Sequence, residues 1–361
     1  SVVSLPGTTL VLENPLSLTG ATLKTNGTTF TTNANALSLS NSSILEVEGV
    51  QDLGGVLLPD NSTTLRLAAN STISDNASLS VGTLDLANFA LTLNDQMAGF
   101  SIIQPVTLDA ATEQIISGAA DLSLNGGISA TSGTLSSTGG TLSLPIGGTL
   151  ASGASFSTSN TTLNLGGSLA VADTWTSTNT SVSLTTDNAS LSSTVALSLA
   201  SLQTNGHDFE LDSATTDLTI QNAFALSGSE TLSTQGADLI FVSSADISSG
   251  STLDASGGGK LEFQQGGTDN GTINAENATF KIGSAYAVPG TLKTNGSTTW
   301  DLASNLDLSG GKLELGGTVG LDKVLTDNLT SFKLGEDATV TRNQGFTLGG
   351  LDLDNSTFTL G

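Results

Sequence analysis

The feature that most constrains the fold is a short alternation of apolar and polar residues that recurs along the whole chain. Triplets such as LVL, LSL, LEV, LRL, LDL and FTL arrive every few residues, with Gly-Gly, Asn-Gly and Ser-Gly dipeptides between them. A period of two predicts half-buried strands, and these dipeptides favour tight turns. A helical stripe is almost absent. The pattern therefore predicts an all-β fold.

A longer repeat lies above this alternation. TLKTNGTTF (Thr22 to Phe30) returns as SLQTNGHDF (Ser201 to Phe209) and as TLKTNGSTTW (Thr291 to Trp300). Weaker copies fall at similar steps, as in TLDL, TLSTQGADL and LDLDNSTFTL. The leucines that mark these copies are separated by multiples of about 30 residues, which predicts an internal repeat with about twelve copies.

Three short strands in each repeat, with one apolar face, are typical of one coil of a parallel β-solenoid. Each coil lays its strands beside those of the preceding coil, so neighbouring coils bury one another's apolar faces. We predict a single β-solenoid domain over residues 1–361. The helix-tolerant stretch DAATEQIISGAA interrupts the repeat, and an irregular coil or an insertion is expected at 95–120.

The repeat also predicts which residues turn and which fill the core. The TNG blocks are expected to occupy one corner of the coil, because Asn and Gly tolerate left-handed backbone conformations. This turn ladder consists of Asn26, Gly27, Asn205, Gly206, Asn295 and Gly296. The predicted inward column consists of Leu23, Leu84, Leu202, Leu232, Leu292, Leu351, Phe30, Phe209, Trp300 and Phe358.

Charge and composition exclude several function classes. The chain has 33 acidic and 9 basic residues and a net charge of −24, which argues against binding to nucleic acid or to anionic lipid. It has no cysteine, and no apolar run reaches the roughly 18 residues of a membrane helix. No cofactor is predicted, although so acidic a surface allows loose binding of Ca²⁺.

Residues for catalysis are scarce. The single histidine, His207, precedes Asp208, but adjacent strand residues face opposite sides. No catalytic residue is predicted, and the expectation is that the chain is not an enzyme. A polysaccharide-active β-helix lyase or hydrolase remains an alternative, since stacked coils could bring acids and bases together on one face.

Metal and ladder-type binding sites are weakly supported. The cluster Asp352, Asp354 and Asn355, and the pair Asp75 and Asn76, are better explained as turns, so no metal site is predicted. Thr-x-Thr occurs at 174–176, 339–341 and 357–359 rather than once in each coil. An ice- or glycan-binding array is a further alternative and would need one regular surface ladder.

The GTLxL, TLDL and LxTNG repeats resemble the β-strand repeat regions of bacterial surface exoproteins, such as filamentous-haemagglutinin-like adhesins and autotransporter passengers. The resemblance extends over essentially the whole chain. It implies an extracellular or cell-surface structural protein, a stalk, adhesin segment or fibre subunit, whose partners are cell-surface glycans or other surface proteins.

Both ends of the sequence are strand-like. The chain opens with SVVSLPGTTLVLENPLSL and closes with NSTFTLG, and neither stretch resembles the polar cap that a solenoid needs. Uncapped terminal coils would leave strand edges open for pairing. We therefore expect head-to-tail self-association, with the alternative that flanking coils or caps lie outside this sequence.

Overall fold

A computed structural model describes residues 1–5, 10–27, 30–31, 37–54, 56–57, 61–74, 78–172, 174–187, 189–212 and 217–361. The side chains of residues 10, 30, 31, 57 and 174 are outside the description. The described chain contains strands and no helix, and the strands pair in parallel as a β-solenoid of about 16 turns. The predicted fold class is confirmed. The chain divides into two compact units, Ser1–Ser181 and Val182–Gly361.

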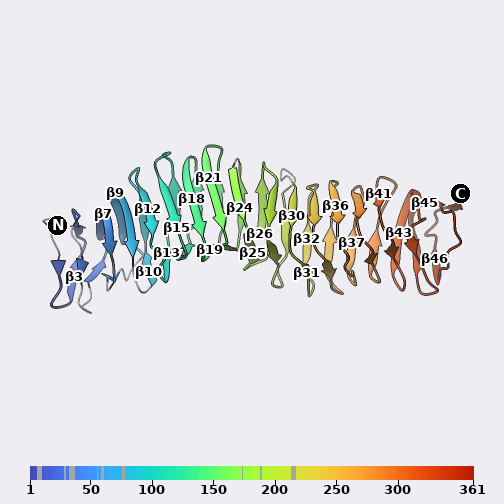
Figure 1. Ribbon diagram of the computed structural model, residues 1–361, viewed down its shortest axis with the longest axis horizontal. Helices are drawn as coiled ribbons and strands as arrows, with labels where there is room; N and C mark the ends of the chain where they lie inside the picture. The colour runs from blue at the N-terminus through green and yellow to red at the C-terminus, as the bar shows by residue number, and fades with distance from the viewer. Residues whose placement is uncertain are drawn as a thin grey trace. The chain divides into compact units, whose positions relative to one another are not determined.

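The first unit contains three main sheets, whose strands follow one another in Figure 1. One sheet contains β1 (Val2–Ser4), β4 (Thr22–Lys24), β7 (Ile44–Asp52), β9 (Thr64–Ser74), β12 (Ala90–Leu93), β15 (Gln114–Ser117), β18 (Gly133–Thr138), β21 (Ala154–Ser159) and β24 (Thr174–Thr178), with β11 (Thr83–Asp85) beside β9. A second contains β10 (Ser78–Val81), β13 (Gly99–Ile102), β16 (Asp121–Leu124), β19 (Thr141–Leu144) and β22 (Thr162–Leu165). A third contains β14 (Val106–Leu108), β17 (Ile128–Ala130), β20 (Gly148–Leu150) and β23 (Ser168–Val171). Smaller groups are β2 (Leu10–Val11) with β5 (Phe30–Thr31), and β3 (Leu16–Thr19) with β6 (Leu37–Ser40) and β8 (Val56–Leu57).

The second unit repeats this arrangement, and β25 (Ser181–Leu184) crosses the boundary between the units. Its longest sheet contains β26 (Ala189–Ser193), β29 (Phe209–Leu211), β32 (Thr231–Ser233), β35 (Thr252–Asp254), β37 (Thr272–Asn274), β40 (Thr291–Lys293), β43 (Lys312–Gly320), β45 (Ser331–Thr341) and β46 (Gly350–Asp352), with β47 (Phe358–Leu360) also paired to β45. Another contains β27 (Leu197–Leu199), β30 (Leu218–Ile220), β33 (Leu239–Phe241), β36 (Lys260–Phe263), β38 (Thr279–Ile282) and β41 (Thr299–Leu302). The remaining strands are β28 (Ser201–Gln203), the pair β31 (Phe224–Leu226) and β34 (Ala245–Ile247), and the group β39 (Tyr286–Ala287), β42 (Leu306–Asp307) and β44 (Val324–Leu325).

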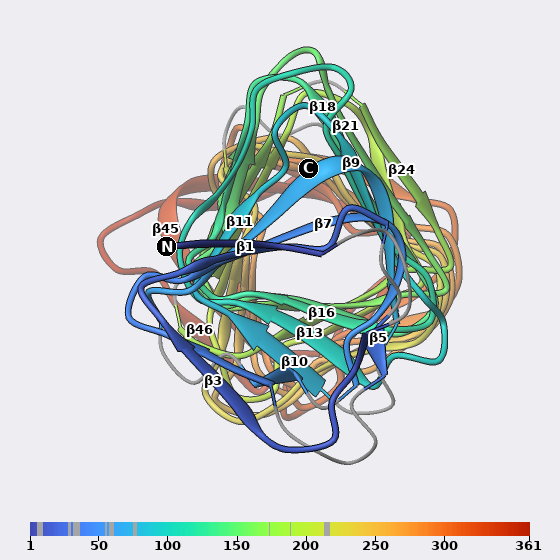
Figure 2. The same cartoon turned by 90° about the vertical axis from the view of Figure 1, so that its left-hand side faces the viewer.

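Inward side chains stack in columns because paired strands keep the same alternation from coil to coil. In the first unit, Leu23 pairs with Leu45, Leu45 with Leu65, and Leu65 with Leu84, and all four are buried. Figure 2 looks along the solenoid and shows strands of the first unit on different sides of this core, with β13 and β16 on one side and β21 and β24 on another. The apolar half of the alternation therefore fills the core.

The predicted coil length is wrong. A coil contains about 20 residues rather than about 30, as shown by the pairing of Leu253 with Ile273 and of Ile273 with Leu292. Similar Thr-Leu segments occur on more than one side of each coil, so a step of 30 residues moves one and a half coils and returns to the same column only at every second step. Leu232 and Leu292 therefore share a column, whereas Leu202, on β28, lies in a different sheet.

The segment 95–120, where an irregular coil or an insertion was expected, contains β13, β14 and β15. Strand β13 pairs with β10 and β16, and β15 pairs with β12 and β18. The acidic and amide residues of DAATEQ form a corner between β14 and β15 instead of a helix, because the carboxylate of Glu113 accepts hydrogen bonds from the backbone N–H groups of Asp109 and Ala110 at 2.8 and 3.2 Å.

Candidate assembly surfaces in the terminal coils

Exposed large apolar side chains gather in the first and last coils. Four of them lie within the first sixteen residues and five lie beyond residue 324, while only Val50 and Ile146 lie between. The terminal members are Val2, Val3, Val11, Leu16, Leu325, Leu329, Leu351, Leu353 and Leu360. Elsewhere the neighbouring coil covers the same kind of residue. The two terminal surfaces are therefore the apolar surfaces that the described fold leaves uncovered.

The outer strands of these coils also have one open edge. Among the described strands, β1 pairs only with β4, and β46 and β47 pair only with β45. Their backbone N–H and C=O groups on the far side have no strand partner. Such an edge can accept a further strand.

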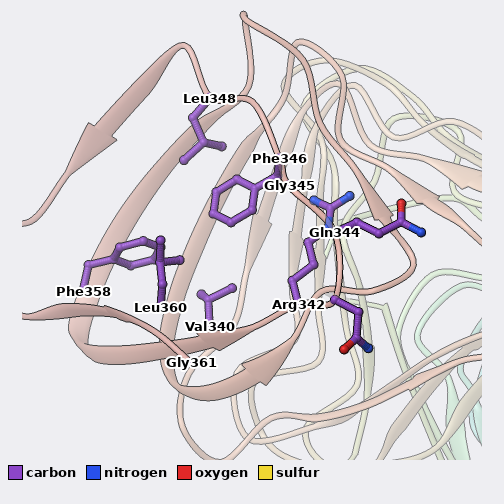
Figure 3. Close-up of a pocket in the computed structure, with 10 residues that line it drawn as sticks. Val340, Arg342, Gln344, Gly345, Phe346, Leu348, Phe358, Leu360 and Gly361 are labelled. Carbon is purple, nitrogen blue, oxygen red and sulfur yellow. The ribbon is translucent and has the colours of Figure 1, made fainter.

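A pocket of about 590 Å³ opens in the last coils of the second unit. Figure 3 shows Val340, Phe346, Leu348, Phe358 and Leu360 around it. Strand β47 brings Phe358 and Leu360 beside Ala338 and Val340 of β45, and the rings of Phe332 and Phe346 stack 5.8 Å apart. The inward residues of the last coil line this space, but no further coil fills it.

Arg342 adds an unpaired charge to this apolar wall. It directly follows β45, and its guanidinium carbon lies 5.6 Å from the centre of the Phe346 ring, within cation–π range. Its Nε and Nη1 atoms are buried and have no hydrogen-bond partner. A buried donor on a charged group is costly to leave unpaired. The pocket therefore offers two unused donors to an acceptor that enters it.

The other cations of the chain are mostly held in ladders between coils. In the first unit, Lys24 pairs with Glu46 at 2.8 Å and Arg66 pairs with Asp85 at 2.7 Å. Register places Glu46 beside Arg66, so the four charges alternate over successive coils. Alternating charges on neighbouring strands stabilise the stack modestly.

The second unit contains the acid–base cluster that a β-helix enzyme would require. Glu262 lies 3.3 Å from Lys260 and 3.2 Å from Lys281, and Lys260 also lies 3.6 Å from Asp238. Burial raises the pKa of Glu262, but hydrogen bonds from the two lysines outweigh burial and leave its pKa lowered. Burial lowers the pKa of Lys260, yet Glu262 and Asp238 leave it raised. Both groups are held in their charged forms, which favours an ion-pair role over proton transfer.

His207 lies at the turn after β28 and makes a surface contact. Its Nδ1 lies 3.0 Å from Asp187 Oδ1, and the two side chains are 30% and 65% exposed. Its sequence neighbour Asp208 instead accepts a hydrogen bond from the Thr231 N–H at 2.6 Å. No His–acid–nucleophile arrangement is formed at His207 by these contacts.

Within the described ranges, no group of three or more His, Cys, Asp or Glu residues is arranged to hold a metal ion. In LDLDNS, the N–H of Asp354 donates to Asp352 Oδ1 at 3.2 Å, and Asp354 and Asn355 have φ values of 41° and 65°. These contacts make a turn. Asp75 and Asn76 lie outside the described residues.

The predicted turn ladder is not one corner of the coil. In the second unit Asn205 follows β28 and Asn295 follows β40, and these strands belong to different sheets. Asn26 and Asn205, with φ of 47° and 55°, and the glycines that follow them, Gly27 and Gly206, adopt left-handed conformations. Asn295 and Gly296 do not, because Asn295 Oδ1 instead accepts from the Ser297 N–H at 3.0 Å.

The asparagines of these turns tie each coil to the one before it. Asn205 Nδ2 donates to Ser183 Oγ at 2.8 Å and to the Leu184 carbonyl at 3.0 Å. Asn26 makes the same pair of bonds in the first unit, to Ser4 Oγ at 2.5 Å and to the Leu5 carbonyl at 2.9 Å. The prediction that each asparagine bonds its own backbone is wrong, because the stacked coil offers the nearer acceptors.

A buried glutamate that sequence reasoning missed completes the Asn205–Gly206 turn. Glu230 accepts hydrogen bonds from the Gly206 N–H, from Thr204 Oγ1 at 2.7 Å and from the Ser227 N–H at 3.0 Å, and it is 2% exposed. Arg342 was also missed. Its only signal was rarity, since the chain has two arginines.

The predicted core residues separate into three groups. Leu23, Leu84, Leu202, Leu232, Leu292 and Phe209 are buried. Trp300 is half-buried against Phe280, with ring centres 5.8 Å apart, and Phe358 is half-buried at the pocket. Leu351 is 46% exposed because no described strand covers β46. The side chain of Phe30 lies outside the description.

The first unit also contains a hydroxyl array. The outward residues of β18, β21 and β24 pair in register, and no charged residue occurs between Asp121 and Asp173. The array consists of Thr134, Ser136, Thr138, Ser155, Ser157, Ser159, Thr176 and Thr178. It is the regular surface ladder that the third alternative required, although it covers three strands only.

No helix suited to crossing a membrane is found in the part of the chain that the structure describes. Comparisons of the sequence and the structure with protein-family models, curated proteins and solved structures produced no match.

Proposed function

We propose that this chain is a non-enzymatic structural protein of a cell surface, a stalk or adhesin segment or a fibre subunit, that associates end to end through its terminal coils. The observation that carries the proposal is the coincidence of open strand edges and uncovered apolar side chains in the first and last coils. Strand addition would continue the parallel stack from one copy to the next. A contact between two different surfaces does not close on itself and so propagates.

The extracellular location and the kinship with β-strand repeat exoproteins are part of the same proposal. The repeated coil, the absence of cysteine and the high acidity support it. Glycans and other surface proteins are the partners to be expected for a stalk of this kind.

Negative-stain electron microscopy of the purified chain, combined with sedimentation velocity over a range of protein concentrations, tests the proposal. Filaments that lengthen with concentration are the expected result. Because copies with a charge of −24 repel one another, added NaCl or Ca²⁺ should lengthen them, and a chelator should reverse only the calcium effect. Single particles at every concentration and salt condition would reject end-to-end association.

A second candidate function rests on the hydroxyl array of β18, β21 and β24. A flat, uncharged set of hydroxyl groups repeated at the strand spacing of about 4.8 Å suits a neutral glycan or an ice surface. Pull-down with insoluble polysaccharides and an assay of ice recrystallisation test the two ligands. Replacement of Ser157 and Thr176 by lysine should abolish binding, and a wild-type chain that is inactive in both assays would exclude this candidate.

A further inference from the structure

We propose that the pocket around Arg342 receives the first coil of a second copy, and that Glu13 of that copy is the acceptor for the unpaired guanidinium donors of Arg342. This inference rests on the proposed end-to-end association and names its contact. It does not depend on any contact between the two units of one chain.

The first argument is the chemistry of the pocket. Nε and Nη1 of Arg342 are buried without partners. A carboxylate is the acceptor that matches a guanidinium best, because it can take two parallel hydrogen bonds. The surrounding wall consists of Val340, Phe346, Leu348 and other apolar side chains, so the carboxylate must arrive on an apolar segment.

The second argument is the composition of the first coil. Glu13 is the only charged side chain before Lys24, and it is exposed. It follows the edge strand β2, beside the exposed side chain of Val11, and the next strand β3 begins at the exposed Leu16. One carboxylate within an apolar edge thus complements one guanidinium within an apolar pocket.

The third argument is the backbone. Strands β46 and β47 flank the pocket side of the last coil with an open edge, and β1 is the open edge of the first coil. A pocket of about 590 Å³ has room for several side chains such as Val11 and Leu16. Backbone pairing would supply register, and the Arg342–Glu13 pair would supply specificity.

The test is a charge-swap series on the intact chain, read by sedimentation velocity. Arg342→Met, which keeps an apolar stem, and Glu13→Gln should each weaken association about 10- to 100-fold. Arg342→Glu combined with Glu13→Arg should restore it. Arg342→Lys should give an intermediate loss, and Glu210→Gln, an exposed acid on β29, is the matched control that should change nothing.

A labelled peptide with the sequence TLVLENPLS, residues 9–17, tests the pocket directly by fluorescence polarisation. It should bind the intact chain, and its Glu13→Gln form should bind about tenfold more weakly. The Arg342→Met chain should no longer distinguish the two peptides. Circular dichroism and melting temperature establish that each variant is folded.

The outcomes separate the two levels of the proposal. Filaments of wild type that persist unchanged in Arg342→Met and Glu13→Gln would overturn the assigned contact and leave end-to-end association standing. A wild-type chain that stays monomeric yet binds the peptide through Arg342 would overturn association and support the pocket. A peptide that fails to bind, or binds both chains equally, would overturn the inference.

Discussion

At the residue scale, the most unusual group is a carboxylate enclosed in the second unit. Asp269 is fully buried, its Oδ1 accepts a hydrogen bond from the Gly271 N–H at 2.8 Å, and its Oδ2 has no partner. Burial raises its pKa to about 7, against the opposing effect of the Gly271 hydrogen bond. The same burial, with the charges of Asp269 and Asp246, raises the pKa of Tyr286. The fold therefore holds Asp269 in its neutral form below about pH 7.

This raised pKa predicts how stability depends on pH. The folded state binds the proton more tightly than the unfolded state, where an aspartate has a pKa of about 3.9. The stabilisation is complete below about pH 4 and is lost as pH rises to about 7, by an amount of the order of 4 kcal/mol. Urea unfolding from pH 5 to 8 should show a steeper fall in wild type than in Asp269→Asn. Parallel curves would show that Asp269 titrates normally.

A second residue-scale prediction concerns Glu230. Its carboxylate joins the Asn205–Gly206 turn to the next coil through three hydrogen bonds, so Glu230→Gln should lower the free energy of unfolding by about 1–3 kcal/mol. Guanidinium denaturation measures the effect. The exposed Glu210→Gln serves as the control, and equal midpoints for the two variants would contradict the assigned role.

At the element scale, aromatic side chains stack across consecutive strands of the second unit. The ring of Phe263, on β36, lies 5.2 Å from Phe241 of β33, 4.4 Å from Tyr286 of β39 and 6.1 Å from Phe280 of β38. The strand alternates these inward rings with the outward charges of Lys260 and Glu262. Each strand of the stack thus contributes to the core on one side and to an ion-pair ladder on the other.

The centre of the aromatic stack should be the most sensitive site. Phe263→Ala would leave a cavity among three rings and should cost about 3–5 kcal/mol. Trp300→Ala, at a half-buried position at the edge of the same sheet, should cost clearly less. Thermal unfolding followed by circular dichroism compares them. A larger effect at Trp300 would show that the outer strands carry more of the stability than their burial indicates.

At the scale of the whole molecule, stability comes from neighbouring coils, and the first and last coils have a neighbour on one side only. This is the general behaviour of solenoids, in which each repeat contacts mainly those beside it. The exposed fractions of Leu351 and Leu360, 46% and 65%, are a direct result. Interior leucines of the same sheet, such as Leu292, are fully buried.

Blocking one terminal edge should therefore stop assembly without unfolding the chain. Leu351→Lys places a charge on an inward position of the open edge strand β46, which natural sheets use against strand addition. Filaments should shorten or disappear while the melting temperature changes little. Ile146→Lys, at a residue 61% exposed within the first unit, is the matched control. Equal filament lengths in both variants would argue against β46 as the contact.

The period-two alternation determined the secondary structure and the parallel stacking, because a short strand with one apolar face can bury it only against copies of itself. Most of the predicted inward leucines lie in the core for this reason. Repeats of near-identical sequence do not by themselves say on which side of the coil each copy lies. The length of every corner decides that, so the true coil of about 20 residues emerged only from the pairing of strands.

The sites required the tertiary structure for the same reason. The partners of Glu230 at Thr204 and Gly206 lie one coil earlier in the sequence, and the orphaned donors of Arg342 result from the packing of residues 340–361 around it. A local sequence pattern contains no record of these distances. Local alternation determined which face of each strand is apolar, and the stacking of coils decided which polar groups meet and which are left without a partner.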